Sequence, residues 1–177
     1  PYIIDTVKRK TKPRVVSWFI WGILTLIAGF ASLSDQQYAA AALSFSASFA
    51  VFIILILGLI YNGDKSISKF DIMCLILAIL GFVLWMIFNS PTIAIIFVIV
   101  IDIIASLPTI KHAWVKPDEE TWITFLLAGI AAMLTLFAAQ SFTVTGVANP
   151  IYLAIINFVI FGIITSRLRV VNRKSHS

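Results

Sequence analysis

Residues 92–110 read TIAIIFVIVIDIIASLPTI, and this stretch decides what kind of fold the chain can adopt. The segment is apolar almost throughout. A helix rises about 1.5 Å per residue, so roughly 20 residues cross the ~30 Å hydrocarbon core of a bilayer. One carboxylate, Asp102, lies at its middle with Ile and Val on both sides. The stretch therefore predicts a transmembrane helix that carries a single ionisable group at mid-depth.

Further apolar runs of similar length lie on both sides of this segment. With residues 92–110 they make six predicted spans, the others being 15–34, 38–61, 72–88, 121–139 and 147–166. The chain is 60% hydrophobic, whereas soluble proteins average about 45–50%. Its mean hydropathy of +1.03 exceeds what a soluble domain of 177 residues could bury. The sequence therefore predicts an all-α fold, a polytopic transmembrane helix bundle.

The basic residues divide the connectors into two kinds. All thirteen Lys and Arg lie either before the first span or directly after the second, the fourth or the sixth span. They are Lys8, Arg9, Lys10, Lys12, Arg14, Lys65, Lys69, Lys111, Lys116, Arg167, Arg169, Arg173 and Lys174. The connectors between them contain none. Because cytoplasmic loops carry the basic excess, we expect these connectors and the C-terminus to be cytoplasmic, in a bacterial inner membrane. Topology thus accounts for the formal charge of +5, and we expect no nucleic-acid partner.

The sequence offers little for catalysis or metal binding. Cys74 is the only cysteine and lies inside a span, so a disulfide framework is excluded and a packing role is expected. His112 and His176 are too far apart to suggest a metal site by themselves. We find no phosphate-binding loop or catalytic set, and the connectors are short. We therefore expect neither enzymatic activity nor a cofactor.

A weak internal repeat relates the two halves of the chain. Pro13 precedes Trp18 by the same spacing as Pro117 precedes Trp122, each time where a span leaves the basic side. Four predicted spans separate these units, so both halves run in the same direction across the membrane. Residues 1–4, which begin with Pro1, read as the last turn of a preceding helix. This favours repeat one in 1–61, a linker helix in 72–88 and repeat two in 92–166, a three-plus-one-plus-three layout that lacks most of its first helix.

This layout resembles the SWEET and PQ-loop transporters, which are built from parallel repeats. The residues 107–110, Leu-Pro-Thr-Ile, resemble the proline-containing end of a repeat's first helix, with Thr109 in place of the family's Gln. Pro1-Tyr2 resembles the same site in the first repeat. The resemblance implies a membrane transporter or facilitator that works by alternating access. It also implies that Asn157, central in the last span, lines the substrate pocket.

Asp102 is the strongest candidate for function. An ionised Asp at mid-membrane costs about 2.5–3.5 kcal/mol on insertion scales, so its side chain should face the bundle interior or be protonated. It is either a coupling or solute-binding group, or a structural acid satisfied by a neighbour. Ser44 and Ser48 share one helical face in the matching stretch of the first repeat. They are further candidates for binding, although small residues more often allow helices to approach closely.

Three residues are candidates for a gate or hinge. Trp18 and Trp122 stand at equivalent repeat positions near the basic side, which suits an interfacial aromatic belt or a cytoplasmic gate. Pro108 near the end of its span predicts either a hinge or a simple helix stop.

Two functions remain open from sequence. The first is transport of a small polar solute, such as a sugar or an amino acid. The second is a non-transporting membrane subunit or scaffold. The expected partners are membrane lipids and, under the first hypothesis, the solute; a homo-oligomer is an open alternative. Transport requires Asp102 and Asn157 to converge on a water-accessible cavity, whereas a scaffold would hold them hydrogen-bonded in a dry centre.

Overall fold

The computed structural model describes residues 1–61 and 63–175, with side chains described as far as residue 170. This part of the chain folds into seven α-helices and one short 3-10 helix: α1 (Tyr2–Val7), α2 (Val15–Ser34), α3 (Tyr38–Ile60), α4 (Lys69–Phe88), α5 (Pro91–Val115), η1 (Pro117–Glu119), α6 (Trp122–Phe137) and α7 (Val144–Ser175). Within the described ranges no strand forms, and the only extended pairing is an isolated bridge between Arg14 and Asp64. The all-α prediction is confirmed.

Five of the helices are long and apolar enough to cross a membrane, namely α2, α3, α4, α5 and α7. The predicted span at 121–139 is shorter than expected, because α6 has only 16 residues. At about 1.5 Å per residue it rises about 24 Å, less than the hydrocarbon core. After Phe137 the chain leaves the helix, and the connector turns toward the start of α3. There Gln140 accepts a hydrogen bond from the backbone N–H of Ala39 at 3.1 Å.

Helix boundaries differ from the prediction where polar residues and prolines decide them. Helix α4 begins at Lys69 rather than 72, because Ser68 and Asp71 form a capping box ahead of it. Helix α5 continues through Pro108 to Val115, so Pro108 is not a helix stop. The last helix begins at Val144, before the predicted 147, and runs on to Ser175. Pro150 therefore lies inside α7 rather than in its opening turn.

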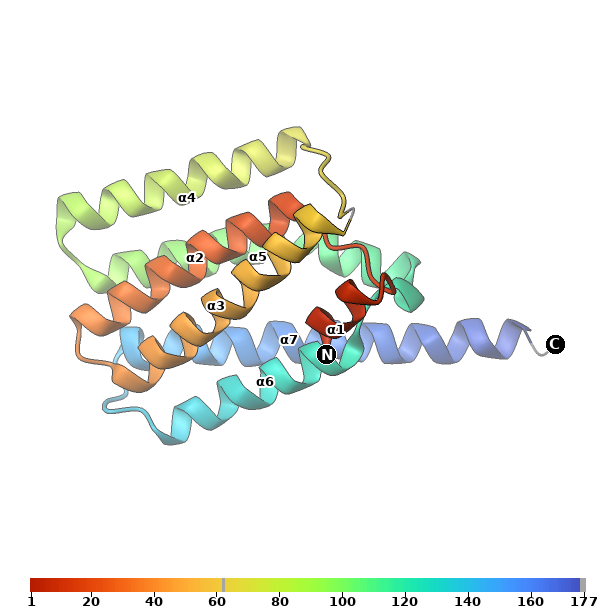
Figure 1. Cartoon of the computed structure of the whole chain (residues 1–177). Coiled ribbons are helices and arrows are strands. Elements are labelled where there is room, and N and C mark those ends of the chain that lie inside the picture. Colours follow the sequence, from red (N-terminus) through yellow and green to blue (C-terminus); the bar gives the residue numbers. More distant parts are fainter. Residues whose placement is uncertain (62, 176–177) are drawn as a thin grey trace.

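The helices lie side by side, with successive members running in opposite directions (Figure 1). Helix α2 packs most closely on α3 and also contacts α4, α5 and α7. Helix α7 packs on both α6 and α5, while α4 lies at the edge against α5 and α2. Glycines allow the closest contacts, since a Cβ at Gly29 would lie 2.6 Å from Cε1 of Phe45. Cys74 is buried in the core formed by α2, α4 and α5, as a packing residue.

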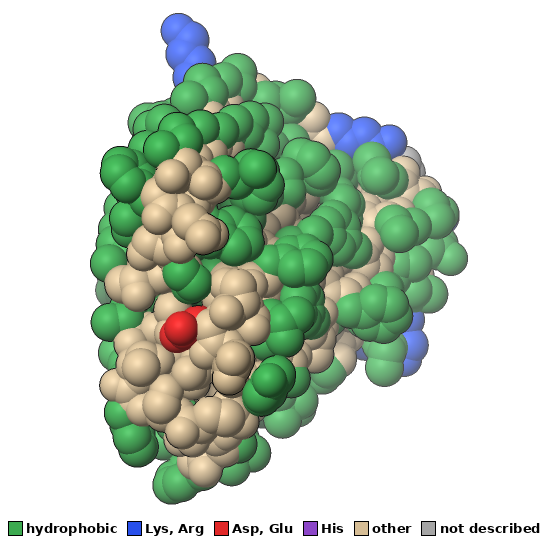
Figure 2. All heavy atoms as spheres, turned by 90° about the vertical axis from the view of Figure 1, so that its left-hand side faces the viewer, with side chains coloured by type: hydrophobic (Ala, Val, Ile, Leu, Met, Phe, Trp, Pro, Cys, Tyr) green, Lys and Arg blue, Asp and Glu red, His purple; other side chains and the backbone are tan. Residues whose placement is uncertain are grey.

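The connectors that carry the basic residues share one end of the bundle, at the right of Figure 1, with α1 and the exposed end of α7. The other connectors, 35–37, 89–90 and 138–143, share the opposite end. Figure 2 views that opposite end, where basic side chains show only at the outline. The charge pattern therefore predicted correctly which connectors lie together.

Large apolar side chains cover the outer surface of the bundle. Phe137 is 86% exposed, and Phe49, Met86 and Ile87 also project outward. Such a surface is unfavourable in water and is consistent with contact with membrane lipids.

Candidate functional site

A cavity of about 220 Å³ lies inside the bundle, between α2 and α3 on one side and α5, α6 and α7 on the other. Most of its lining is aliphatic. The residues with polar groups come from all these helices except α3, and they are Trp18, Trp21, Thr25, Asp102, Ser106, Thr124, Asn149 and Asn157. We call this space the inner cavity.

Asp102 is the one ionisable side chain among the described residues that line the inner cavity. Helix α5 places it between Ile101, which is buried in the core, and Ile103, which faces outward. Its Oδ1 is buried and has no hydrogen-bond partner among the described residues. The hydroxyl of Tyr152 and the indole N–H of Trp21 approach the same carboxyl group as hydrogen-bond donors. An unpartnered carboxylate oxygen in a non-polar site is costly, and here it borders an open space.

Asn157 lines the same cavity from α7. Its Nδ2 donates to the carbonyl of Leu153 in its own helix at 2.8 Å, and no described residue donates to its amide oxygen. The structure therefore brings Asp102 and Asn157 together on one cavity. Asn149 of α7, which sequence reasoning did not single out, also lines it and donates through Nδ2 to Ser44 Oγ at 3.3 Å.

The two serines of α3 lie elsewhere. Ser44 and Ser48 are buried and do not line the inner cavity. Ser48 Oγ donates to the carbonyl of Gly22 on α2 at 3.3 Å, and Ser44 accepts from Asn149 on α7. These contacts join helices to one another, in keeping with the packing alternative.

Three aromatic residues separate the inner cavity from a second space. The ring centroids of Tyr2 and Trp18 lie 4.8 Å apart, and those of Trp18 and Trp21 lie 5.3 Å apart, edge to face. Trp18 and Trp21 line both spaces. We call these residues the aromatic cluster. Trp122 does not join it, being 41% exposed and packed on Phe161, so the two repeat-related tryptophans do not form one gate.

The second space, which we call the vestibule, has a volume of about 430 Å³ and lies at the basic end of the bundle. Pro108 lines it, together with four basic residues, three acidic residues and His112. The imidazole bridges two carboxylates, with Nδ1 2.8 Å from Glu120 Oε1 and Nε2 3.1 Å from Glu119 Oε2. Lys116 Nζ donates to Glu119 Oε1 at 2.7 Å and, as the main cause, lowers the pKa of that carboxyl group. No group of three metal-ligating side chains occurs in the described part of the chain.

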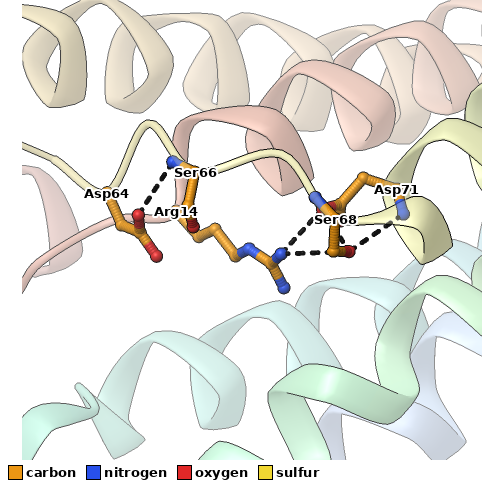
Figure 3. A network of polar contacts seen from close by, with 5 residues as sticks. All are labelled: Arg14, Asp64, Ser66, Ser68 and Asp71. Carbon is orange, nitrogen blue, oxygen red and sulfur yellow. Dashed lines mark hydrogen bonds and ion pairs between the residues drawn. The ribbon is translucent and has the colours of Figure 1, made fainter.

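A polar network that sequence reasoning missed ties α4 to α2 (Figure 3). Asp71 is only 3% exposed, and its Oδ2 accepts from Arg14 Nη2 at 2.7 Å. The same oxygen accepts from the backbone N–H and the hydroxyl of Ser68, at 2.7 Å and 2.6 Å. Alongside it, the backbone N–H of Val15 donates to the carbonyl of Asp64 at 2.8 Å. The available signal was the Ser-x-x-Asp spacing of a capping box at 68–71.

A second network closes the opposite end of the bundle. The Thr145 hydroxyl at the start of α7 donates to the carboxylate of Asp35, and Ser32 Oγ donates to the carbonyl of Thr145 at 3.2 Å. Gln37 Nε2 donates to Ser141 Oγ at 2.8 Å. We call this the far-end closure. It holds the connector between α2 and α3 against the start of α7.

Comparisons with known proteins give no relative. No family model matches the chain, and no match was found among curated proteins or solved structures. The functional argument therefore depends on the geometry of the residues described above.

Proposed function

We propose that the protein is a membrane transporter or facilitator of a small polar solute, with no catalytic role. The observation that carries this proposal is that Asp102 on α5 and Asn157 on α7 line one inner cavity with unused hydrogen-bonding capacity. A carboxyl group that borders an open space together with an amide oxygen suits a solute site better than a purely structural role, because structural polar groups are normally enclosed by their partners. The geometry thus favours transport over the scaffold alternative.

Alternating access would involve two three-helix units, α1–α3 and α5–α7, joined by α4. In each unit the third helix packs on the other two, since α3 contacts α1 and α2 while α7 contacts α5 and α6. The inner cavity lies between the units, as expected for a site exposed alternately to either side. This arrangement supports the SWEET and PQ-loop resemblance. The short α6 would serve as the sixth span, with the residues that flank it completing the crossing.

The two ends of the cavity provide candidate gates. At the basic end the aromatic cluster stands between the inner cavity and the vestibule, and at the other end the far-end closure ties α2 and α3 to α7. With the basic connectors and the C-terminus in the cytoplasm of a bacterium, the vestibule would open to the cytoplasm. Pro108 lines the vestibule and lacks the backbone N–H that would complete the hydrogen bonding of α5. Bending of α5 at this residue would let one three-helix unit rotate against the other.

Uptake into proteoliposomes tests this proposal. The purified protein is reconstituted and screened against labelled sugars, amino acids, amines and vitamins, with empty liposomes as the baseline. For the solute that enters, Asp102→Asn is expected to lower uptake about tenfold, within the range of a hydrogen bond to a charged group. Asp118→Asn makes the same charge change at an exposed residue that lines neither space, and it should leave uptake unchanged. Uptake equal to that of empty liposomes for every class would refute transport.

A further inference from the structure

We infer that the solute held in the inner cavity is a small organic cation, a protonated or quaternary amine with a compact apolar body. Asp102 and the faces of Trp18 and Trp21 would hold its positive charge. The inference deepens the proposed function and rests on the same cavity.

The charge balance of the cavity carries the first step. Asp102 is the only ionisable residue among the described lining residues, so no Lys or Arg of the protein neutralises it there. The nearby side chains of Tyr152 and Trp21 are uncharged. A buried charge without a counter-charge is strongly unfavourable, and a cationic solute would supply the missing partner. An anionic solute would place a second negative charge beside an ionised Asp102, whereas a cationic solute would pair with it.

The aromatic lining carries the second step. Trp18 and Trp21 both border the cavity, and their rings pack edge to face at 87° with centroids 5.3 Å apart. Cations are attracted to the face of an indole within about 6 Å of its centroid, and tryptophan is the most effective residue for this contact. Trp21 also neighbours the carboxyl of Asp102, so the carboxylate and an aromatic group serve the same region of the cavity.

The remaining lining and the volume define the body of the solute. Twelve of the twenty lining residues are aliphatic or phenyl side chains, including Leu24, Ile54 and Val98. A sugar carries hydroxyl groups around its ring, and most of this wall could not pair with them. The volume of about 220 Å³ is below the roughly 300–1,000 Å³ of sites for drug-sized ligands. The site therefore suits one cationic head with a few carbon atoms.

Equilibrium binding to the full chain in lipid nanodiscs tests the inference without requiring transport. The probes are choline, its neutral isostere in which a tert-butyl group replaces the trimethylammonium group, and the carboxylate that corresponds to that isostere. Isothermal titration should show choline binding at least about tenfold more tightly than the neutral isostere, with no binding of the carboxylate. This comparison uses the wild-type protein, so it does not depend on the folding of any variant.

Matched variants locate the site. Asp102→Asn should reduce choline affinity about tenfold, to that of the neutral isostere, while Asp118→Asn should not. Trp18→Leu should weaken choline binding about threefold or more relative to the isostere. Trp85→Leu is the control, because Trp85 lines neither space. Equal affinity for choline and its isostere, or a preference for the carboxylate, would overturn the inference.

Binding and uptake separate the two proposals. If choline binds through Asp102 but neither choline nor any other amine enters proteoliposomes, the cation site stands and the transport proposal fails. If a sugar is taken up and the wild-type protein shows no preference for choline, transport stands and the cation inference fails.

Discussion

Replacing Asp71 by alanine should destabilise the protein, although this residue lines neither the inner cavity nor the vestibule. The carboxylate is 3% exposed and accepts three hydrogen bonds at one oxygen, two from Ser68 and one from Arg14. Loss of the hydrogen bonds that Asp71 accepts from Ser68 costs about 1 kcal/mol, with the Ser68 cap itself still in place, and loss of a hydrogen bond between charged groups costs about 1.5–3 kcal/mol. Because the Arg14 side chain is 29% exposed and water can partly replace its partner, we expect a total decrease of about 2–3 kcal/mol in the free energy of unfolding.

Chemical unfolding in detergent micelles, followed by circular dichroism, measures this loss. Asp71→Asn should cost less than Asp71→Ala, because its amide oxygen still accepts from the backbone N–H of Ser68. In a double-mutant cycle with Arg14→Met the coupling energy should be about 1–2 kcal/mol. Asp118→Asn, the same change of carboxyl to amide at an exposed residue, is the control and should change stability by less than about 0.5 kcal/mol. A loss below that value for Asp71→Ala would show that the network in Figure 3 does not hold α4 to α2.

Two other predictions concern helix packing and the far-end closure. Gly29→Ala should lower the free energy of unfolding by about 1–3 kcal/mol, because the added methyl group would overlap the ring of Phe45. In the control Gly162→Ala, the added methyl group meets no atom within 4 Å, so this variant should be as stable as the wild type or more stable. Thermal unfolding of both variants checks this, and equal melting temperatures would contradict it. Thr145→Val should loosen the far-end closure. In a protein that also carries Cys74→Ala and Asn149→Cys, the new thiol group should then react faster with a membrane-impermeant thiol reagent. An unchanged labelling rate would mean that the hydrogen bond from Thr145 to Asp35 does not limit access.

The sequence predicted the helices well because their signal is local. Apolar runs and basic connectors are properties of neighbouring residues, and they identified the helical segments and the shared basic end. The early end of α6 at Phe137 was missed because Ala138 and Ala139 extend the apolar run without a local stop signal. The pairing of Arg14 with Asp71 was missed because the two residues are distant in sequence, although the capping box within it was a local signal.

Depth in the membrane was easier to predict than the direction of a side chain. Asp102 and Asn157 are central in their apolar runs, and both line the inner cavity. The serines of α3 are equally deep, but the cavity is lined by the neighbouring stripe at Ala47, Ala50, Val51 and Ile54. The small residues at Ser44 and Ser48 indicated the face that packs on other helices, but the sequence of α3 contains no signal for which residues line the cavity. Likewise, the common spacing of Trp18 and Trp122 did not imply a common environment, because only Trp18 packs on Tyr2 of α1.

The buried polar atoms without partners follow the route proposed for the solute. In the described part of the chain they are Nε of Arg14, Oε1 of Gln37, Oδ1 of Asp102, Oγ1 of Thr124 and Oη of Tyr152. Arg14 lines the vestibule, Asp102 and Thr124 line the inner cavity, Tyr152 neighbours Asp102, and Gln37 belongs to the far-end closure. Well-packed proteins satisfy such groups, and exceptions concentrate where function requires them. Under the transport proposal, these atoms are the groups that a polar solute would contact on its way through the bundle.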